Sequence, residues 1–118
     1  MKRTRTPDDL EDFGRFSEPA VLILVSLADG PKHGYAITAD IEVVAGFRPG
    51  PGTLYGAIAR LETRGLIEAL ESRDRRRPYR LTAQGETALR ARLAALEAVA
   101  RAGQARLARG QEAGLARA

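Results

Sequence analysis

The stretch HGYAITADIEVVAGFRPGPGTLYGAIARLETRG, residues 33–65, decides the fold of this chain. In its first half, Ile37, Ile41 and Val44 lie at i, i+4 and i+7, the spacing of an apolar stripe along one helix face. This spacing predicts a helix that begins near residue 33 or 34 and ends at Gly46, because Gly is the common residue just after a helix.

The second half of the stretch repeats the pattern. Leu54, Ile58 and Leu61 predict the core stripe of a helix over residues 53–64, and Gly65 is placed to end it in the left-handed conformation. A stiff turn rich in Pro and Gly connects the two helices. Two amphipathic helices joined by a short turn that contains Gly form a helix-turn-helix.

A buried helix is expected before this pair. The segment Val21–Leu27 is apolar around nearly the whole helix circumference, which is typical of a helix at the centre of a small domain. Ser17 is placed to cap its start, and Pro19 falls in the first turn, where its missing N–H does no harm. Asp-Gly-Pro at 29–31 ends the helix. Residues 1–16 change from basic to acidic, and we expect a flexible tail or one loosely docked turn there.

After Gly65 the apolar period changes from that of a helix to that of a strand. Leu66–Glu71 and Pro78–Thr82 predict the strands of a hairpin, and residues 72–77 form its charged tip. Such a hairpin is the wing of a winged helix-turn-helix. Because like charges on a tip repel one another, a polyanionic partner explains its arginines, with a solvated loop as the alternative. These arginines are Arg73, Arg75, Arg76, Arg77 and Arg80.

Thr82 is placed to cap a long last helix. Its leucines follow a 4-3 spacing that continues through Ala100, Gly103 and Leu107, the spacing of a coiled-coil seam. Since the preceding helices already close a small core, we predict a homodimer, with packing inside one chain as the alternative. Gly103, Gly110 and Gly114 interrupt this helix, and because Gly disfavours helix they predict fraying beyond about residue 105. The seam residues are Leu89, Leu93, Leu96 and Val99.

Length and charge fit a mainly α chain with a small β-hairpin and an anionic partner. The 118 residues suffice for one modest core, and 19 Lys and Arg against 15 Asp and Glu give a net charge of +4. We expect residues 17–82 to form the winged helix-turn-helix domain and residues 83–118 the dimerisation helix.

Composition also excludes several classes of site. No Cys is present, so disulfides, thiolate zinc sites and cysteine nucleophiles are excluded. With one His besides, we expect no catalytic residue, no metal and no cofactor. No apolar run is long enough to cross a bilayer, and the N-terminus lacks a signal-peptide core. We therefore expect a soluble, cytoplasmic protein without a membrane partner.

One face of the second helix of the pair carries groups that suit DNA. At about 100° per residue, this face lies opposite the core stripe. An Arg can bind guanine bidentately, a Thr can contact phosphate or base, and a Gly lets the helix approach closely. The alternative is a solvated face with ordinary surface arginines. The face is formed by Thr53, Gly56, Arg60 and Arg64, and the N–H groups at the helix start, on Gly52, Thr53 and Leu54, are placed to bind a phosphate.

The aromatic residues near this face leave two interpretations open. Tyr55 lies off the stripe, so packing beside the wing competes with a phosphate contact. Tyr35 opens the first helix of the pair, where its hydroxyl reaches the DNA backbone or its ring belongs to the core. Tyr79 joins the wing arginines among the candidate DNA contacts. His33 is expected to cap or pack rather than to act as a base or ligand.

Together these residues resemble the PadR family of bacterial transcriptional regulators. The matching motifs are HGY at 33–35 with Ile37, PGTLY at 51–55, RLE-x-x-GLI at 60–67 and RRPYRLTAQG at 76–85. The resemblance covers about residues 19–95. It implies a homodimeric winged-helix repressor of double-stranded DNA that dimerises through a C-terminal helix and is often released by a small molecule. The single helix after the wing is similar to the short subgroup of the family.

The chain departs from the family pattern in two places. Gly56 stands where a Pro usually follows the LY pair, and this Gly loosens the helix turn or admits closer approach to DNA. No Trp is present, so the tryptophan-stacking drug pocket of some relatives is not carried over. The effector, and whether one exists, is left open.

The sequence leaves three classes of function open. The first is a sequence-specific repressor that binds an inverted-repeat operator as a homodimer. The second is a winged-helix module that binds protein or RNA. Arginines on both helix and wing favour duplex DNA, because side chains read the deep, narrow major groove of A-form RNA poorly. The third is an enzyme, which the lack of a convergent His, Cys or carboxylate set disfavours.

Overall fold

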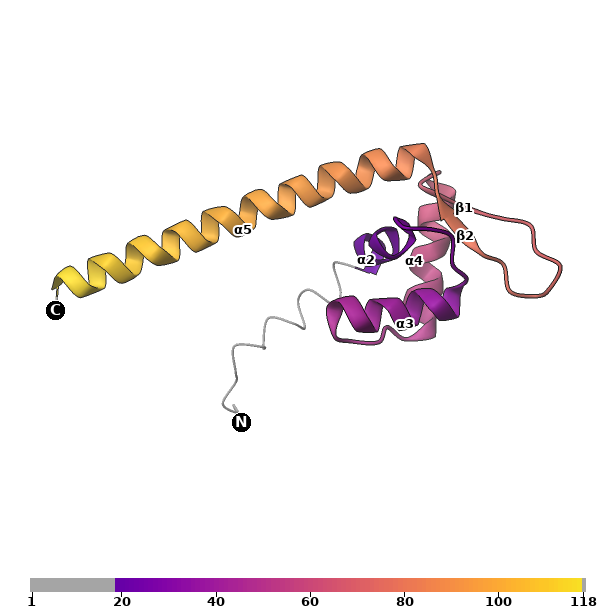
Figure 1. Ribbon diagram of the computed structural model, residues 1–118, viewed down its shortest axis with the longest axis horizontal. Helices are drawn as coiled ribbons and strands as arrows, with labels where there is room; N and C mark the ends of the chain where they lie inside the picture. The colour runs from indigo at the N-terminus through magenta and orange to yellow at the C-terminus, as the bar shows by residue number, and fades with distance from the viewer. Residues whose placement is uncertain (1–18, 118) are drawn as a thin grey trace.

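The computed structural model describes residues 19–117, with side chains through residue 114. In this part, helices α2 (Pro19–Leu27), α3 (Gly34–Ala45) and α4 (Pro51–Thr63) form a cluster. Strands β1 (Ile67–Ala69) and β2 (Tyr79–Leu81) form an antiparallel hairpin that projects from one side of it. Helix α5 (Ala83–Arg117) starts beside the hairpin, passes the cluster and continues well beyond it (Figure 1). The mainly α winged helix-turn-helix with a long last helix is confirmed.

Helix α2 lies at the centre of the cluster. It begins at Pro19, as predicted, and contacts α3, α4 and α5. Ile23, Leu24 and Leu27 are buried, because an apolar helix in contact on several sides has little surface left for water. The predictions for Ser17 and for the tail of residues 1–16 lie outside the described residues.

Local signals position the helix-turn-helix. His33 caps α3, since its Nδ1 accepts a hydrogen bond from the Ala36 N–H at 3.4 Å. Gly46 ends α3 with φ 82°, and Gly65 follows α4 with φ 77°, so both take the left-handed conformation that Gly adopts without a Cβ clash. Helix α4 begins at Pro51, two residues before the predicted start, because Pro is well suited to a first helical turn.

The apolar stripe of α3 is shorter than predicted. Ile37 and Ile41 are buried, but Val44 is 56% exposed. The prediction that Val44 belongs to the core is therefore wrong. Its turn is the last one of α3, and that end of the helix lies away from α4 (Figure 1).

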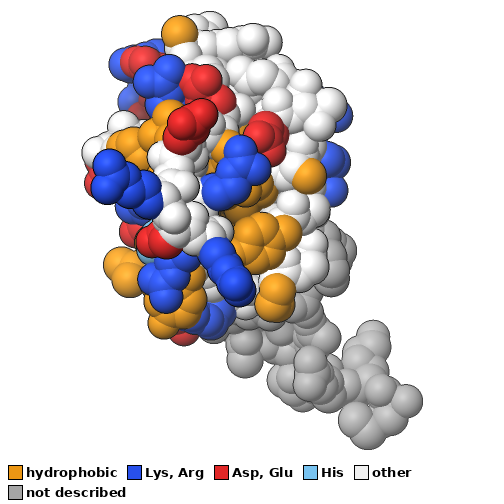
Figure 2. Space-filling view, turned by 90° about the vertical axis from the view of Figure 1, so that its right-hand side faces the viewer, with side chains coloured by type: hydrophobic (Ala, Val, Ile, Leu, Met, Phe, Trp, Pro, Cys, Tyr) orange, Lys and Arg blue, Asp and Glu red, His pale blue; other side chains and the backbone are white. Residues whose placement is uncertain are grey.

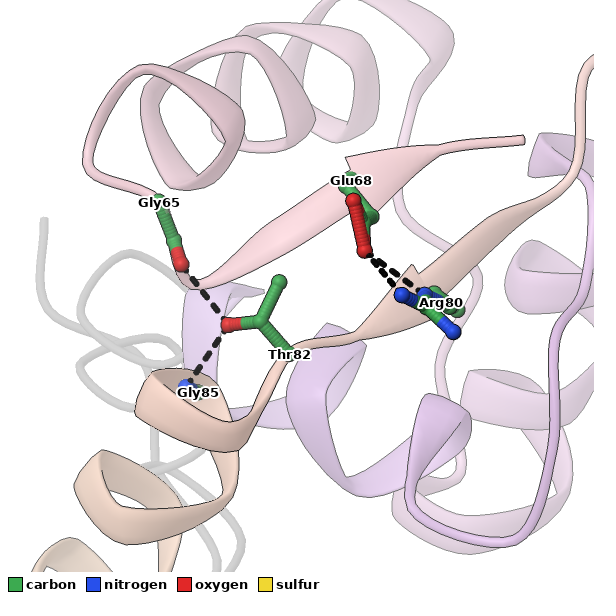
Figure 3. Close-up of polar contacts among 5 residues, drawn as sticks. All are labelled: Gly65, Glu68, Arg80, Thr82 and Gly85. Carbon is green, nitrogen blue, oxygen red and sulfur yellow. Dashed lines mark hydrogen bonds and ion pairs between the residues drawn. The ribbon is translucent and has the colours of Figure 1, made fainter. Parts of the chain in front are cut away.

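The wing is tied to the helices at two points. Tyr79 pairs with Ala69 in the hairpin, and across its other edge it exchanges backbone hydrogen bonds with Lys32 at 3.1 and 2.9 Å. Thr82, which follows β2, donates its hydroxyl to the Gly65 carbonyl at 2.7 Å and accepts the Gly85 N–H at 3.0 Å (Figure 3). Thr82 is thus the predicted cap of α5, and it also fastens α5 to the end of α4.

The start of α5 belongs to the core of its own chain. Leu89 is only 4% exposed and packs in the main apolar cluster. The prediction that Leu89 contributes to a seam between two copies is therefore wrong, because the Thr82 cap directs the first turns of α5 onto α2. The exposed part of the leucine stripe starts at Leu93, which is 44% exposed.

The rest of α5 is a single continuous helix. It reaches Arg117, so the predicted fraying beyond residue 105 is wrong in this structure. Alanines and ordinary helix formers between the glycines supply enough helix propensity, and Arg101 lies 3.6 Å from Glu97 one turn away. No helix among residues 19–117 is both long and apolar enough to span a membrane.

Candidate nucleic-acid interface

The outer face of α4 presents cations and small residues together. Thr53, Arg60 and Arg64 are exposed, as predicted. A Cβ built on Gly56 would lie 3.6 Å from Nη1 of Arg60, so the Arg60 guanidinium lies over the surface that Gly56 leaves low. This arrangement offers a forked donor above a flat stretch of helix, which suits close approach to base edges.

The start of α4 has no side-chain cap. Its N-cap residue is Gly50, which has no side chain to accept the first N–H groups. The N–H groups of Gly52 and Thr53 belong to the first turn, where N–H groups have no partner within an α-helix, and the positive end of the helix dipole favours an anion there. Leu54 is different. Its side chain is 1% exposed and its N–H donates to the Gly50 carbonyl at 2.9 Å, so the prediction of a DNA contact by Leu54 is wrong.

Tyr55 packs against the start of α3. A Cβ built on Gly34 would lie 2.7 Å from Cζ of Tyr55 and closer still to its hydroxyl oxygen, so the ring covers the glycine. Gly34 is therefore needed for Tyr55 to lie where it does, which gives a physical reason for finding HGY and PGTLY in one chain. Half of the Tyr55 side chain stays exposed, and a phosphate contact by its hydroxyl remains a prediction.

Tyr35 and Arg48 form an aromatic and cationic pair beside Tyr55. Tyr35 is 67% exposed, so it is not a core residue. The guanidinium carbon of Arg48 lies 5.6 Å from the Tyr35 ring centroid, within the range of a cation–π contact. Glu42 accepts from Nη1 of Arg48 at 2.8 Å, and this bond raises the pKa of the Arg48 guanidinium.

Sequence reasoning missed Arg48 because it lies in the turn rather than on a helix face. A cation two residues before the N-cap of α4 is the signal that could have found it. It borders a hollow of about 450 Å³ that Tyr35, Tyr55 and Leu54 also line.

The wing tip has an ordered backbone and exposed arginines. Asp74 accepts from the Ser72 hydroxyl at 3.0 Å and from the Arg76 N–H at 2.9 Å. These bonds hold the pKa of the Asp74 carboxyl below its ordinary value, with the Ser72 hydroxyl as the larger cause, so the group stays ionised at neutral pH. The arginines with exposed side chains are Arg73, Arg75, Arg76 and Arg77.

Arg80 differs from the tip arginines. It pairs with Glu68 on the opposite strand through Nε at 2.7 Å (Figure 3). Both side chains are about half exposed, so the pair adds little stability, but it neutralises Arg80 locally. The positive charge of the wing is therefore concentrated at the tip.

A hollow of about 350 Å³ brings together the wing tip, the start of α3 and Tyr55 of α4. It lies where the wing approaches the start of α3 and one side of α4, and its lining is aromatic and cationic. Figure 2 shows the molecule from the hairpin side, with Lys and Arg side chains, and some Asp and Glu among them, spread over this face around exposed apolar groups. The residues that line the hollow are His33, Gly34, Tyr35, Tyr55, Arg75, Arg76, Arg77 and Tyr79.

Comparison with known proteins agrees with this geometry. The sequence profile of the transcriptional regulator PadR-like family matches residues 23–91. The Mycobacterium tuberculosis transcriptional regulator Rv3488 is 39% identical over 82 residues, which cover 67% of this chain and 76% of that protein. A 37.1 kDa protein of transposon TN4556 from Streptomyces fradiae is 53% identical over 75 residues, 64% of this chain. The match spans only 22% of that protein's length.

A solved structure of a PadR family regulator has the same fold. A PadR family transcriptional regulator from Eggerthella lenta superposes with a TM-score of 0.69 at 26% identity, covering 80% of this chain and 85% of that one.

Proposed function

Because the chain belongs to the PadR-like family of transcriptional regulators, as its motifs indicated, we propose that it binds double-stranded DNA as a homodimer and represses transcription from an inverted-repeat operator. The observation that supports this proposal is one hollow that the wing-tip arginines share with Tyr35 and Tyr55, with the Tyr35–Arg48 pair beside it. The exposed Thr53, Arg60 and Arg64 of α4 add a separate cationic surface.

Each element has a separate role on the duplex. Helix α4 lies in the major groove, where Arg60 and Arg64 contact base edges or neighbouring phosphates. The uncapped start of α4 binds a phosphate. The wing arginines bind phosphates or a narrow minor groove, where the negative potential is strongest. Base contacts therefore come from α4, and most of the salt-dependent affinity comes from the wing.

Dimerisation presents two copies of this surface to one operator. The exposed apolar stripe of α5, with Leu93, Leu96 and Val99, supplies the contact between copies. A two-fold dimer places its recognition helices about one DNA turn apart, roughly 34–36 Å, so half-site centres lie about ten base pairs apart or at a multiple of this distance. A small-molecule effector would act by binding more tightly to the dimer at one distance between its two DNA-binding domains than at another.

Selection of binding sites from random duplexes tests the proposal directly. Wild-type protein should enrich an inverted repeat with this half-site spacing. The Arg75→Ala/Arg76→Ala/Arg77→Ala variant should enrich the same sequence, with weaker binding to every duplex and a salt slope smaller by about one unit per lost phosphate contact. Enrichment of single-stranded RNA over duplex DNA in a parallel selection, or no enrichment of any duplex, would refute the proposal.

A further inference from the structure

The Arg60 side chain runs back along α4 toward the start of the helix. A Cβ built on Gly56 would lie 3.6 Å from Nη1 of Arg60, so the guanidinium lies beside Gly56 rather than beside the Cα of Arg60. This is the usual direction of a long side chain on a helix. The displacement along the helix is about 6 Å, because four residues rise by about 1.5 Å each.

Gly56 leaves the Arg60 guanidinium room at this place, and no acid competes for it. Among residues 19–114, no acidic side chain pairs with Arg60, whereas Glu42 engages Arg48. The donors of Arg60 are therefore available to an acceptor on DNA. An Arg fork binds O6 and N7 of guanine bidentately in the major groove. A long side chain at residue 56 would occupy the place of the guanidinium and displace it.

A second feature of the same face is a hollow nearer the end of α4. It has a volume of about 210 Å³, and Ala59, Arg60, Thr63 and Arg64 line it. Ala59 and Thr63 are four residues apart and both exposed, so they are neighbours on the helix surface. At about 100° per residue from Leu54, they lie at roughly 140° and 180°, opposite the buried side of α4. The sequence pattern did not single out either residue.

The side chains of this hollow suit a methyl group. Ala59 offers only a methyl, and Thr63 carries a methyl beside its hydroxyl. Neither side chain can form a bidentate hydrogen bond with a base. Ala and Thr methyl groups instead contact the 5-methyl group of thymine in the major groove. The two arginines add aliphatic stems at the sides of the hollow. A cytosine at this place would leave the hollow without its methyl group.

We propose that α4 reads a guanine through Arg60 held over Gly56 and, one or two base pairs further along the half-site, a thymine methyl group through Ala59 and Thr63. This pair of contacts rests on the proposed function and names the bases that the α4 face takes. Gly56 and the middle of the hollow are about five residues apart, which is about 7.5 Å along the helix. Base pairs follow one another at about 3.4 Å, so this distance corresponds to about two steps.

Uracil substitution tests the methyl contact, because uracil differs from thymine only by lacking this group. The half-site is obtained by selection with the full chain, each of its thymines is replaced singly by uracil, and Kd is measured by fluorescence anisotropy. At one thymine, uracil should weaken wild-type binding about fourfold, the factor given by burial of one methyl-sized group. The Ala59→Gly/Thr63→Ser variant should bind both duplexes equally. Thr87→Ser/Ala91→Gly, with the same two changes on α5, should keep the fourfold ratio.

The ratio compares two duplexes on one protein, so any loss of folded variant cancels. Tolerance of uracil at every thymine of the half-site, or a loss that persists in Ala59→Gly/Thr63→Ser, would overturn the methyl contact. Enrichment of cytosine at this place, with tighter binding of 5-methylcytosine, would assign the hollow to methylated DNA and would overturn the proposal for thymine. If the wild type enriches no duplex, the proposed function itself fails. The other outcomes defeat only the base contacts, because they require an operator that is bound.

A second measurement tests the guanine contact and the role of Gly56. The quantity is the ratio of affinities for the selected duplex and for the same duplex with adenine in place of the guanine. This ratio should be at least about fivefold for the wild type and close to one for Arg60→Ala. Gly56→Met should also bring it close to one, whereas Gly56→Ala should keep it, because a Cβ at 3.6 Å is in ordinary contact with the guanidinium.

Glu62→Met is the matched control for the longer side chain. Glu62 lies on α4 at roughly 80° from Leu54, away from the Arg60 side, so the ratio should stay at the wild-type value. A ratio that survives Gly56→Met would show that the guanidinium does not need the space over Gly56 and would overturn this part of the proposal. A wild-type half-site without a guanine that depends on Arg60 would overturn it as well.

Discussion

Replacing Gly85 with alanine should destabilise the chain more than any other glycine substitution in the described part. A Cβ at this position would lie 2.9 Å from the carbonyl carbon of Leu66 and 2.9 Å from Cδ1 of Leu81, and closer still to the Leu66 carbonyl oxygen. That oxygen also accepts the Thr82 N–H at 3.1 Å. Because the obstructing atoms are backbone, the first turn of α5 must move away from the end of α4.

The expected loss follows from the contacts at this junction. Overpacking costs about 1–3 kcal/mol. The shift also strains the bond from the Thr82 N–H to the Leu66 carbonyl and the two bonds of the Thr82 hydroxyl, to the Gly65 carbonyl and the Gly85 N–H (Figure 3), at about 1 kcal/mol each. Alanine is more favourable than glycine in a helix by about 0.5–1 kcal/mol, which offsets part of this loss. We therefore expect the free energy of unfolding to fall by about 3–5 kcal/mol, a large part of the roughly 5–15 kcal/mol typical of a domain.

Urea unfolding followed by far-UV circular dichroism measures this loss. Protomer concentration must be equal for all variants, since association contributes to apparent stability. Gly52→Ala is the matched control, because it lies in α4 and a Cβ there would meet no atom within 4 Å. Its free energy of unfolding should change by less than about 1 kcal/mol. A Gly85→Ala variant within about 1 kcal/mol of wild type would refute the packing argument.

Four further outcomes are expected. Arg60→Ala should cost roughly 1–3 kcal/mol of operator binding and relax the preference at one position per half-site, whereas Arg101→Ala, with the same charge change on α5, should bind as wild type does. Arg48→Ala should weaken binding to all duplexes alike but lower the salt slope by less than about one unit, because Glu42 already pairs with Arg48; unchanged binding would remove Arg48 from the interface. Leu93→Asp/Leu96→Asp should yield monomers by sedimentation with at least tenfold weaker operator binding, and Ala98→Asp, away from the stripe, should stay dimeric. Gly34→Ala should lower the free energy of unfolding by about 1–3 kcal/mol in the wild type but little in a Tyr55→Ala background, where the obstructing ring is gone.

Local chemistry explains why most of the fold could be predicted. The turn glycines Gly46 and Gly65 and the cap residue Thr82 act through contacts within a few residues or through their own backbone conformation. Helical periodicity placed Leu54, Ile58 and Leu61 in the core for the same reason, because one face of a short helix must be buried. These signals need no knowledge of the tertiary arrangement.

The errors occur where tertiary arrangement decides the outcome. Periodicity predicts on which face of its helix Val44 or Leu89 lies. It does not predict whether another element of the chain packs against that face. Val44 lies on the α3 turn that projects past α4, and Leu89 lies where α5 still contacts α2. For Leu54, the pattern predicts both a core side chain and an N–H group that binds phosphate. The side chain is 1% exposed, and the N–H donates to the Gly50 carbonyl at 2.9 Å, so only the core prediction is confirmed. Arg48 was missed because its position depends on Tyr35 and Glu42, which lie on another element.

Within residues 19–114, contacts fasten the elements of the proposed DNA surface to one another, and α5 joins them at its start. Tyr55 packs on Gly34, and the backbone of Lys32 pairs with Tyr79, so α3, α4 and the wing are fastened to one another near the proposed DNA surface. Among the described residues, helix α5 contacts this unit at its start, through the Thr82 cap and the packing of Leu89. A ligand that alters operator affinity without touching DNA would therefore have to change the angle of α5 at this junction or the pairing of the two α5 helices. Since both changes act on the distance between the two domains, such a ligand should weaken binding to the spaced inverted repeat far more than binding to an isolated half-site.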